Sequence, residues 1–107
     1  MGGIVKTIAL WKRWKVSEAL LRSAHRALPR EKEKEERFRF LEREFLEYLE
    51  HNEHELALDM MQELGELSAP RGGFWKDLIR AAENMELHHR VPYLQRQFDE
   101  ALARLKT

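Results

Sequence analysis

Apolar side chains repeat every three or four residues through most of this 107-residue chain. One such stripe consists of Phe38, Leu41, Phe45, Tyr48 and Leu49. This spacing places apolar residues on one face of an α-helix, and no segment shows the sustained alternation that is typical of a β-strand. The three prolines and five glycines fall at plausible helix boundaries. The sequence therefore predicts an all-α fold.

Breaks between the periodic stretches predict four to five amphipathic helices. The stretches cover about 4–28, a second that begins within 31–36 and ends near 50, and then 53–66, 74–87 and 92–105. Because the links are short, consecutive helices should be antiparallel, and we expect a small bundle built from antiparallel helical hairpins. Residues 1–107 are expected to form a single helical domain, in which a basic N-terminal helical segment, 1–30, precedes a helical core, 31–107.

Two polar residues are expected to mark helix starts. Asn52 is a good N-cap for the third helix, and Glu55 stands three residues later, in the capping-box position. Ser17 could cap a second helix and so divide the first stretch near 15–17. The apolar face expected for the third helix is Leu56, Ala57, Met60, Met61, Leu64 and Leu67.

Charge is distributed unevenly, although the 19 basic and 19 acidic residues cancel. Residues 1–30 carry seven basic side chains and one acidic side chain, a net charge of +6. Residues 31–69 carry five basic and thirteen acidic side chains, a net charge of −8, and residues 70–107 have a net charge of +2. Such asymmetry bears on partners and association rates rather than on the fold.

Several classes of function lack their sequence signatures. With no cysteine, the chain has no disulfide, thiol nucleophile or cysteine-based zinc site. It has no nucleophile elbow, P-loop or zinc-protease motif, so we expect no enzyme, no catalytic residues, no cofactor and no small-molecule substrate. No apolar run reaches the roughly 20 residues of a membrane span, and no signal peptide is evident, so we expect a cytoplasmic protein. No role is assigned to the turn histidines, which are expected to be exposed and to bind no metal: His51, His54, His88 and His89.

The acidic side chains around the break at His51-Asn52 are the candidate binding residues. The partner-binding residues that we predict are Glu47, Glu50, Glu53, Glu55 and Asp59. They form either a solubilising polar face or a docking surface for a basic protein, whose association they would accelerate. A docking surface should include aromatic anchors, and the candidates are Tyr48, Phe74 and Trp75, each of which could instead be core.

The basic N-terminal segment has three alternative roles. It could bind nucleic acid or an anionic membrane through Lys6, Lys12, Arg13, Lys15 and Arg22. The acidic middle of the chain would repel phosphates, so we favour instead ion pairing with that middle inside the bundle. The third alternative is a self-associating structural or adaptor module, a homodimer in which the segment packs through Ile4, Ile8, Trp11 and Trp14.

A family resemblance rests on the segment FLEYLEHNEHELALD, 45–59, followed by ELG at 63–65. With FWKDL at 74–78 and AAENM at 81–85, it resembles small helical bacterial immunity proteins of polymorphic and contact-dependent toxin systems, the MafI-like type among them. The resemblance covers about 37–87. It implies a cytoplasmic, non-enzymatic inhibitor that binds and neutralises a cognate toxin. Many such toxins are nucleases with basic channels, which an acidic helical face could plug.

Overall fold

The computed structural model describes the backbone of residues 2–106 and the side chains of residues 8–106. Within these residues it has five α-helices and no strand. The helices are α1 (Gly2–Arg26), α2 (Glu36–Glu50), α3 (His54–Ser68), α4 (Gly72–Asn84) and α5 (Val91–Leu105), and a 3₁₀ helix, η1 (His88–Arg90), precedes α5. The prediction of a small all-α bundle is confirmed.

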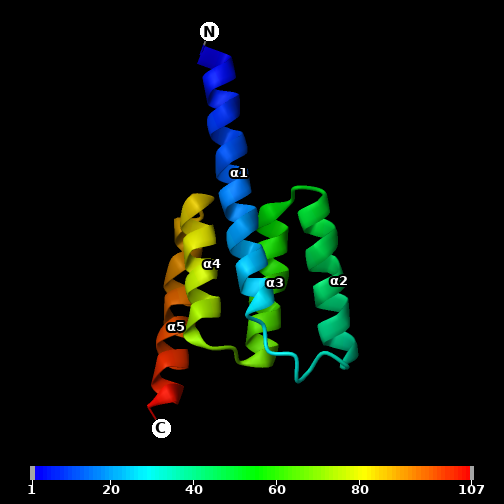
Figure 1. The fold of residues 1–107 in the computed structure, drawn as a ribbon. Coiled ribbons are helices and arrows are strands. Elements are labelled where there is room, and N and C mark those ends of the chain that lie inside the picture. The colour runs from blue at the N-terminus through cyan, green and yellow to red at the C-terminus, as the bar shows by residue number, and fades with distance from the viewer. Residues whose placement is uncertain (1, 107) are drawn as a thin grey trace.

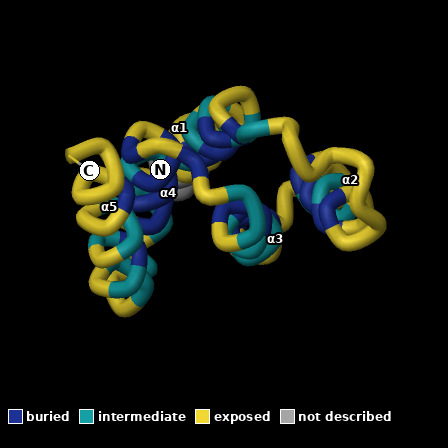
Figure 2. Tube along the Cα trace, turned by 90° about the horizontal axis from the view of Figure 1, so that it is seen from below, coloured by how far each residue is buried: buried dark blue, intermediate teal, exposed yellow. Residues whose placement is uncertain are grey.

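Successive helices run in opposite directions, so that α2 and α3 form one antiparallel hairpin and α4 and α5 form another (Figure 1). Helix α1 joins the two hairpins, because it packs most extensively against α4 and also contacts α3. Viewed along the helices, α1, α4 and α5 gather on one side, and α3 separates them from α2 (Figure 2). The interior is therefore built by helices from both ends of the sequence.

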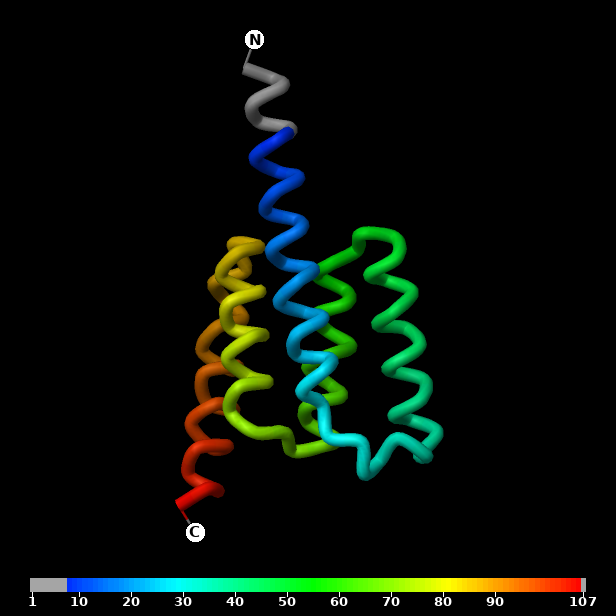
Figure 3. The backbone as a smooth tube through the Cα atoms, viewed as in Figure 1, coloured from blue at the N-terminus to red at the C-terminus, as the bar shows by residue number. Residues whose placement is uncertain are grey.

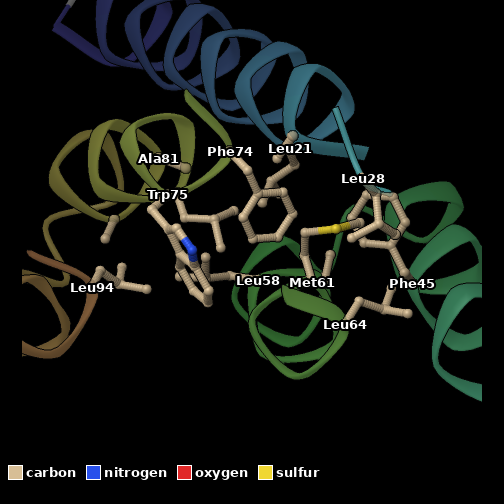
Figure 4. Close-up of a cluster of buried hydrophobic side chains, with 14 of the residues drawn as sticks. Leu21, Leu28, Phe45, Leu58, Met61, Leu64, Phe74, Trp75, Ala81 and Leu94 are labelled. Carbon is tan, nitrogen blue, oxygen red and sulfur yellow. The ribbon is translucent and has the colours of Figure 1, made fainter. Parts of the chain in front are cut away.

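The buried apolar side chains form one cluster between the helices (Figure 4). The largest of them are Trp75, Phe38, Phe45, Phe74, Leu21, Leu41, Leu49, Leu58, Met61, Leu64, Leu78 and Leu94. The rings of Phe74 and Trp75 meet edge to face, with their centroids 5.0 Å apart and their planes at 87°, an arrangement that the ring quadrupoles favour. The stripe predicted on α2 is confirmed, since four of its five residues are buried.

Gly65 is the point of closest approach between α3 and α4. A Cβ atom at this position would lie 2.4 Å from Cε1 of Phe74 and 2.8 Å from Cη2 of Trp75. No real side chain fits at those distances without moving the two rings. The absence of a side chain on Gly65 therefore allows both rings of α4 to pack directly on the backbone of α3.

The turn between α2 and α3 is closed by backbone hydrogen bonds at the C-terminus of α2. The amide of Glu53 donates to the carbonyl of Tyr48 (2.9 Å), and the amide of Asn52 donates to the carbonyl of Leu49 (3.1 Å). Asn52 has a φ of 57°, so this is a Schellman motif with asparagine in the left-handed position. The predicted capping box is wrong, because Glu53 is the N-cap of α3 and forms no side-chain cap bond.

Helix α1 is continuous and extends beyond the rest of the bundle (Figure 3). The possible break at 15–17 does not occur, and Ser17 is buried within the helix. At 1.5 Å per residue, its 25 residues span about 37 Å, whereas the 15 residues of α3 span about 22 Å. We call residues 8–16, the described side chains of this extension, the overhang. The side chains of Ile4 and Lys6 lie outside the described residues.

Candidate functional site

The five predicted binding residues surround the turn between α2 and α3. Glu47 and Glu50 lie in the last turn of α2, while Glu55 lies in the first turn of α3. The turn places them at the end of the bundle from which the overhang projects (Figure 1). Four of the five are exposed, and we call them the acidic turn: Glu47, Glu50, Glu53 and Glu55. The fifth, Asp59, is partly buried on α3.

The acidic turn carries uncompensated charge. Among the described residues, none of its four carboxylates takes part in an ion pair. Asp59 differs, because its Oδ1 lies 2.8 Å from Nη1 of Arg90. Farther along α3, Glu63 pairs with Arg37 across the hairpin at 2.9 Å. Asp59 is therefore the least available of the five predicted residues.

The basic residues of the first thirty positions pair elsewhere. Arg13 binds Glu86 at 2.9 Å, and Arg22 binds Glu18 on its own helix at 3.3 Å. Arg30 does reach the acidic segment 31–69, where it binds Glu33 and Glu42. Glu42 lies eight residues before the end of α2, about 12 Å from the turn. The predicted pairing between the basic and acidic segments is thus confined to the connector before α2 and to the middle of α2.

The pKa of Glu42 on α2 and the pKa of His51, the C-cap of α2, are shifted in opposite directions by their surroundings. A hydrogen bond from Arg30 holds the pKa of Glu42 below its ordinary value, against the opposing effect of partial burial. At the turn, Nδ1 of His51 donates to the carbonyl of Glu47 (2.9 Å). This bond raises the pKa of His51, and the carboxylates of Glu50, Glu47 and Glu53 raise it further. The carboxylates of the acidic turn therefore create a negative field that favours a bound cation.

Two exposed leucines adjoin the acidic turn. Leu46 lies off the buried stripe of α2, one helical turn before Glu50, and Leu56 lies beside Glu55 on α3. Leu56 was predicted to face the core, but α3 buries Leu58 instead. The proposed anchors Phe74 and Trp75 are core residues and are not exposed at any surface. Apolar contacts near the acidic turn would therefore come from leucines rather than from these two aromatic rings.

His54 is buried, so the prediction that it is an exposed turn histidine is wrong. Its exposed fraction is 7 %, its Nε2 has no hydrogen-bond partner, and burial lowers its pKa. It lines two hollows of about 350 and 180 Å³, together with Trp14 of the overhang. The sequence held a signal for this burial, because His54 precedes Leu58 by four residues and Met61 by seven, the spacing of one helical face.

Of the remaining turn histidines, His51 lies in a different turn from the adjacent pair His88 and His89. His51 is exposed after α2, and His88 and His89 are exposed in η1. Within the described part of the chain, no three histidine or acidic side chains are grouped so that they could hold a metal ion. Across residues 2–106, no helix has both the length and the apolar character that a membrane crossing requires.

Comparison with models of known families, with curated proteins and with solved structures finds no match for this chain. The resemblance to immunity proteins therefore stays a prediction from the sequence of residues 37–87.

Proposed function

We propose that this protein is a cytoplasmic, non-enzymatic binding module, and more specifically an immunity-type inhibitor. Its acidic turn would bind a basic surface on a cognate toxin domain and so neutralise the toxin. The single observation that carries the proposal is the set of four exposed carboxylates without an ion pair among the described residues. A chain that only needed a soluble surface could intersperse charges of both signs there.

The proposed mechanism is electrostatic competition. A nuclease attracts phosphate through a basic channel, and a compact group of carboxylates competes for the same field. Complementary charge would accelerate association, and the exposed Leu46 and Leu56 would add apolar contact once the surfaces meet. The closed Schellman turn holds the backbone at Glu50 and Glu53 in a fixed relative position, so that binding need not order the main chain there.

The test needs a defined partner. We would take the variable C-terminal domain of a large secreted protein, if such a protein is encoded by the preceding open reading frame, and express it with this chain. Growth rescue by the wild-type chain is expected. Glu50→Lys combined with Glu53→Lys should slow association with the purified domain and reduce the salt dependence of the association rate.

A matched control comes from the other end of α2. Glu35, like Glu53, is a helix N-cap without a side-chain cap bond, so Glu31→Lys combined with Glu35→Lys makes the same charge change away from the turn. These control variants should associate at the wild-type rate. If the turn variant and the control behave alike, the acidic turn is not the interface and the proposal is wrong.

A further inference from the structure

The overhang exposes large apolar side chains on a part of α1 that the rest of the chain covers only in part. Ile8, Leu10, Trp11, Trp14 and Val16 are each 46 to 55 % exposed. They lie on several sides of the helix, between the basic side chains of Lys12, Arg13 and Lys15. The overhang therefore exposes a cluster of large apolar groups, which on a soluble chain marks a surface for contact.

The buried stripe of α1 continues into the overhang without a break. Within the bundle, the buried positions of α1 are Ser17, Leu21 and Ala24, separated by four and three residues. Continuing the same spacing toward the N-terminus reaches Trp14 and Leu10, which lie on the same side of the helix. This is the spacing of a helix–helix seam. Beside Ser17 and Leu21 the seam is filled by α4 and α3, whereas along the overhang it is half-exposed.

The charges of the overhang are opposite to those of the acidic turn. The overhang carries three basic side chains, Lys12, Arg13 and Lys15, and no acidic one. Among the described side chains of one copy, no ion pair joins the two surfaces, since Arg13 binds Glu86 and Lys15 lies 3.7 Å from Glu18. One surface is basic and apolar, and the other is acidic and flanked by Leu46 and Leu56. Each surface therefore has the chemistry that would complement the other.

We propose that a second copy of this chain covers the overhang, in a two-fold dimer in which each overhang lies against the acidic turn of the other copy. Both surfaces lie at the same end of the bundle (Figure 3), so a single two-fold axis makes both contacts at once. The five apolar side chains of the overhang expose on the order of 500 Å² per copy. One partner covers only part of this area, and the acidic turn with Leu46 and Leu56 would contribute to the roughly 800 Å² that each partner buries in a standard interface.

A second copy fits this surface better than an anionic membrane does. A lipid surface that attracted Lys12 and Lys15 would at the same time repel the four carboxylates of the acidic turn beside them. A second copy satisfies both sets of charges. The inference does not depend on the proposed inhibitor function, although a basic partner would compete with the second copy for the same carboxylates.

The test is a charge exchange between two variants, measured by sedimentation velocity on the full chain without any partner. The first variant combines Lys12→Glu with Lys15→Glu, and the second combines Glu50→Lys with Glu53→Lys. Each variant alone should dimerise at least tenfold more weakly than the wild type, because like charges then meet at both contacts. An equimolar mixture should dimerise about as tightly as the wild type, because both contacts of a mixed dimer again join opposite charges.

Two controls make the same charge changes in the 31–35 connector, at the other end of the bundle. They are Lys32→Glu with Lys34→Glu, and Glu31→Lys with Glu35→Lys, and both should dimerise like the wild type. Circular dichroism would verify that every variant keeps its helix content. A mixture that stays monomeric while the wild type dimerises would overturn the proposed contact.

A wild-type chain that stays monomeric at about 200 µM in low salt would overturn the dimer altogether. In that case, binding of the chain to vesicles of phosphatidylserine and phosphatidylcholine, lost with Lys12→Glu and Lys15→Glu, would assign the overhang to a lipid surface instead.

Discussion

The interior of the bundle and the end from which α1 projects are built in different ways. In the interior, where α3 meets α4, the contacts are apolar and so close that Gly65 has no room for a side chain. At the projecting end, α1 is attached to α4 mainly through polar groups of Arg13, Ser17 and Asn84. Beside these groups lie two hollows lined by His54 and Trp14.

This difference shows that tight packing and exposed charge are separated in this small helical chain. The tightly packed interior determines the fold, whereas the projecting end combines exposed apolar groups, unpaired carboxylates and a buried histidine without a partner. Regions with few buried apolar contacts contribute little to stability and are therefore available for binding. Substitutions in the two regions should consequently change the free energy of unfolding by different amounts, and in one case in the opposite direction.

The largest effect is expected when the interior part of α1 loses a side chain. Leu21 is fully buried, so Leu21→Ala should lower the free energy of unfolding by roughly 3 kcal/mol through lost burial and a residual cavity. Leu10 lies on the same stripe but in the overhang, and Leu10→Ala should change the value by less than about 0.5 kcal/mol. Chemical denaturation at a concentration where the chain is monomeric would measure both. Equal losses would show that the overhang is packed as tightly as the interior.

A smaller loss is expected from adding a methyl group to the interior. Gly65→Ala would force apart the rings of Phe74 and Trp75 and should cost about 2 kcal/mol, despite the better helix propensity of alanine. A Cβ at Gly73 meets nothing within 4 Å, so Gly73→Ala should be neutral or slightly stabilising. The melting temperature of Gly65→Ala should therefore fall, whereas that of Gly73→Ala should stay the same or rise. A stable Gly65→Ala protein would mean that α3 and α4 are not tightly packed.

Asn84 connects the two regions and should have an intermediate effect. Its Nδ2 donates to the carbonyl of Arg13 (2.8 Å) and to Oγ of Ser17 (2.7 Å), and Ser17 is buried. Asn84→Ala should lower the free energy of unfolding by about 1 to 2 kcal/mol, because it removes both bonds. It should also speed the hydrogen exchange of backbone amides near Arg13 more than that of amides near Ala24. The exposed neighbour Glu83 offers a control, since Glu83→Ala should change neither measurement.

A gain of stability is expected where the projecting end carries backbone strain. Glu86 follows α4 with a φ of 61°, a left-handed conformation that glycine adopts without steric cost. Glu86→Gly should raise the free energy of unfolding by about 0.5 kcal/mol, even though the exposed ion pair with Arg13 is lost. Glu86→Ala loses the same ion pair and keeps the strain, so it should bring no gain. Thermal unfolding of the two variants would separate these contributions.

The smallest effect is expected from pH, through His54. Burial lowers the pKa of His54 in the folded chain, while Glu18 opposes this shift and Lys15 adds to it. The unfolded chain therefore takes up the proton more readily, and stability that is present above about pH 6.5 should be lost as the pH falls below that value. The difference in unfolding free energy between the wild type and His54→Gln should shrink between pH 7 and pH 5. A constant difference would mean that His54 is solvated in the fold.

Much of this architecture could be predicted from spacing alone. The stripe on α2 and the antiparallel hairpins depend on local periodicity and short links, which are visible in a single sequence. The role of Asn52 could not be predicted, because asparagine is favoured both at an N-cap and in the left-handed position after a helix. Long-range packing decided the rest, since only the folded chain shows that Gly65 faces Phe74 and that α1 extends past its neighbours.

The candidate binding surface was predictable in position but not in its surroundings. Acidic side chains on both sides of a short break must come together, whatever closes the turn. Which cations reach them depends on how α1 is placed, and the sequence alone predicts only that the basic and acidic segments pair, not which residues do. The exposure of Leu56 and the burial of His54 depend on the rotation of α3 about its axis. Moving the predicted apolar face by one or two residues is enough to exchange which of these side chains faces the core.

The turn between α2 and α3 is closed in a way that leaves most of its side chains free to vary. Main-chain amides and carbonyls close it, the His51 side chain adds one bond to the carbonyl of Glu47, and of its residues only Asn52 has a left-handed backbone. The neighbouring carboxylates are therefore free of any duty in folding, so they can be exchanged one at a time at little cost to the scaffold. A library randomised at Glu47, Glu50, Glu53 and Glu55 should therefore keep the helix content and melting temperature of the wild type.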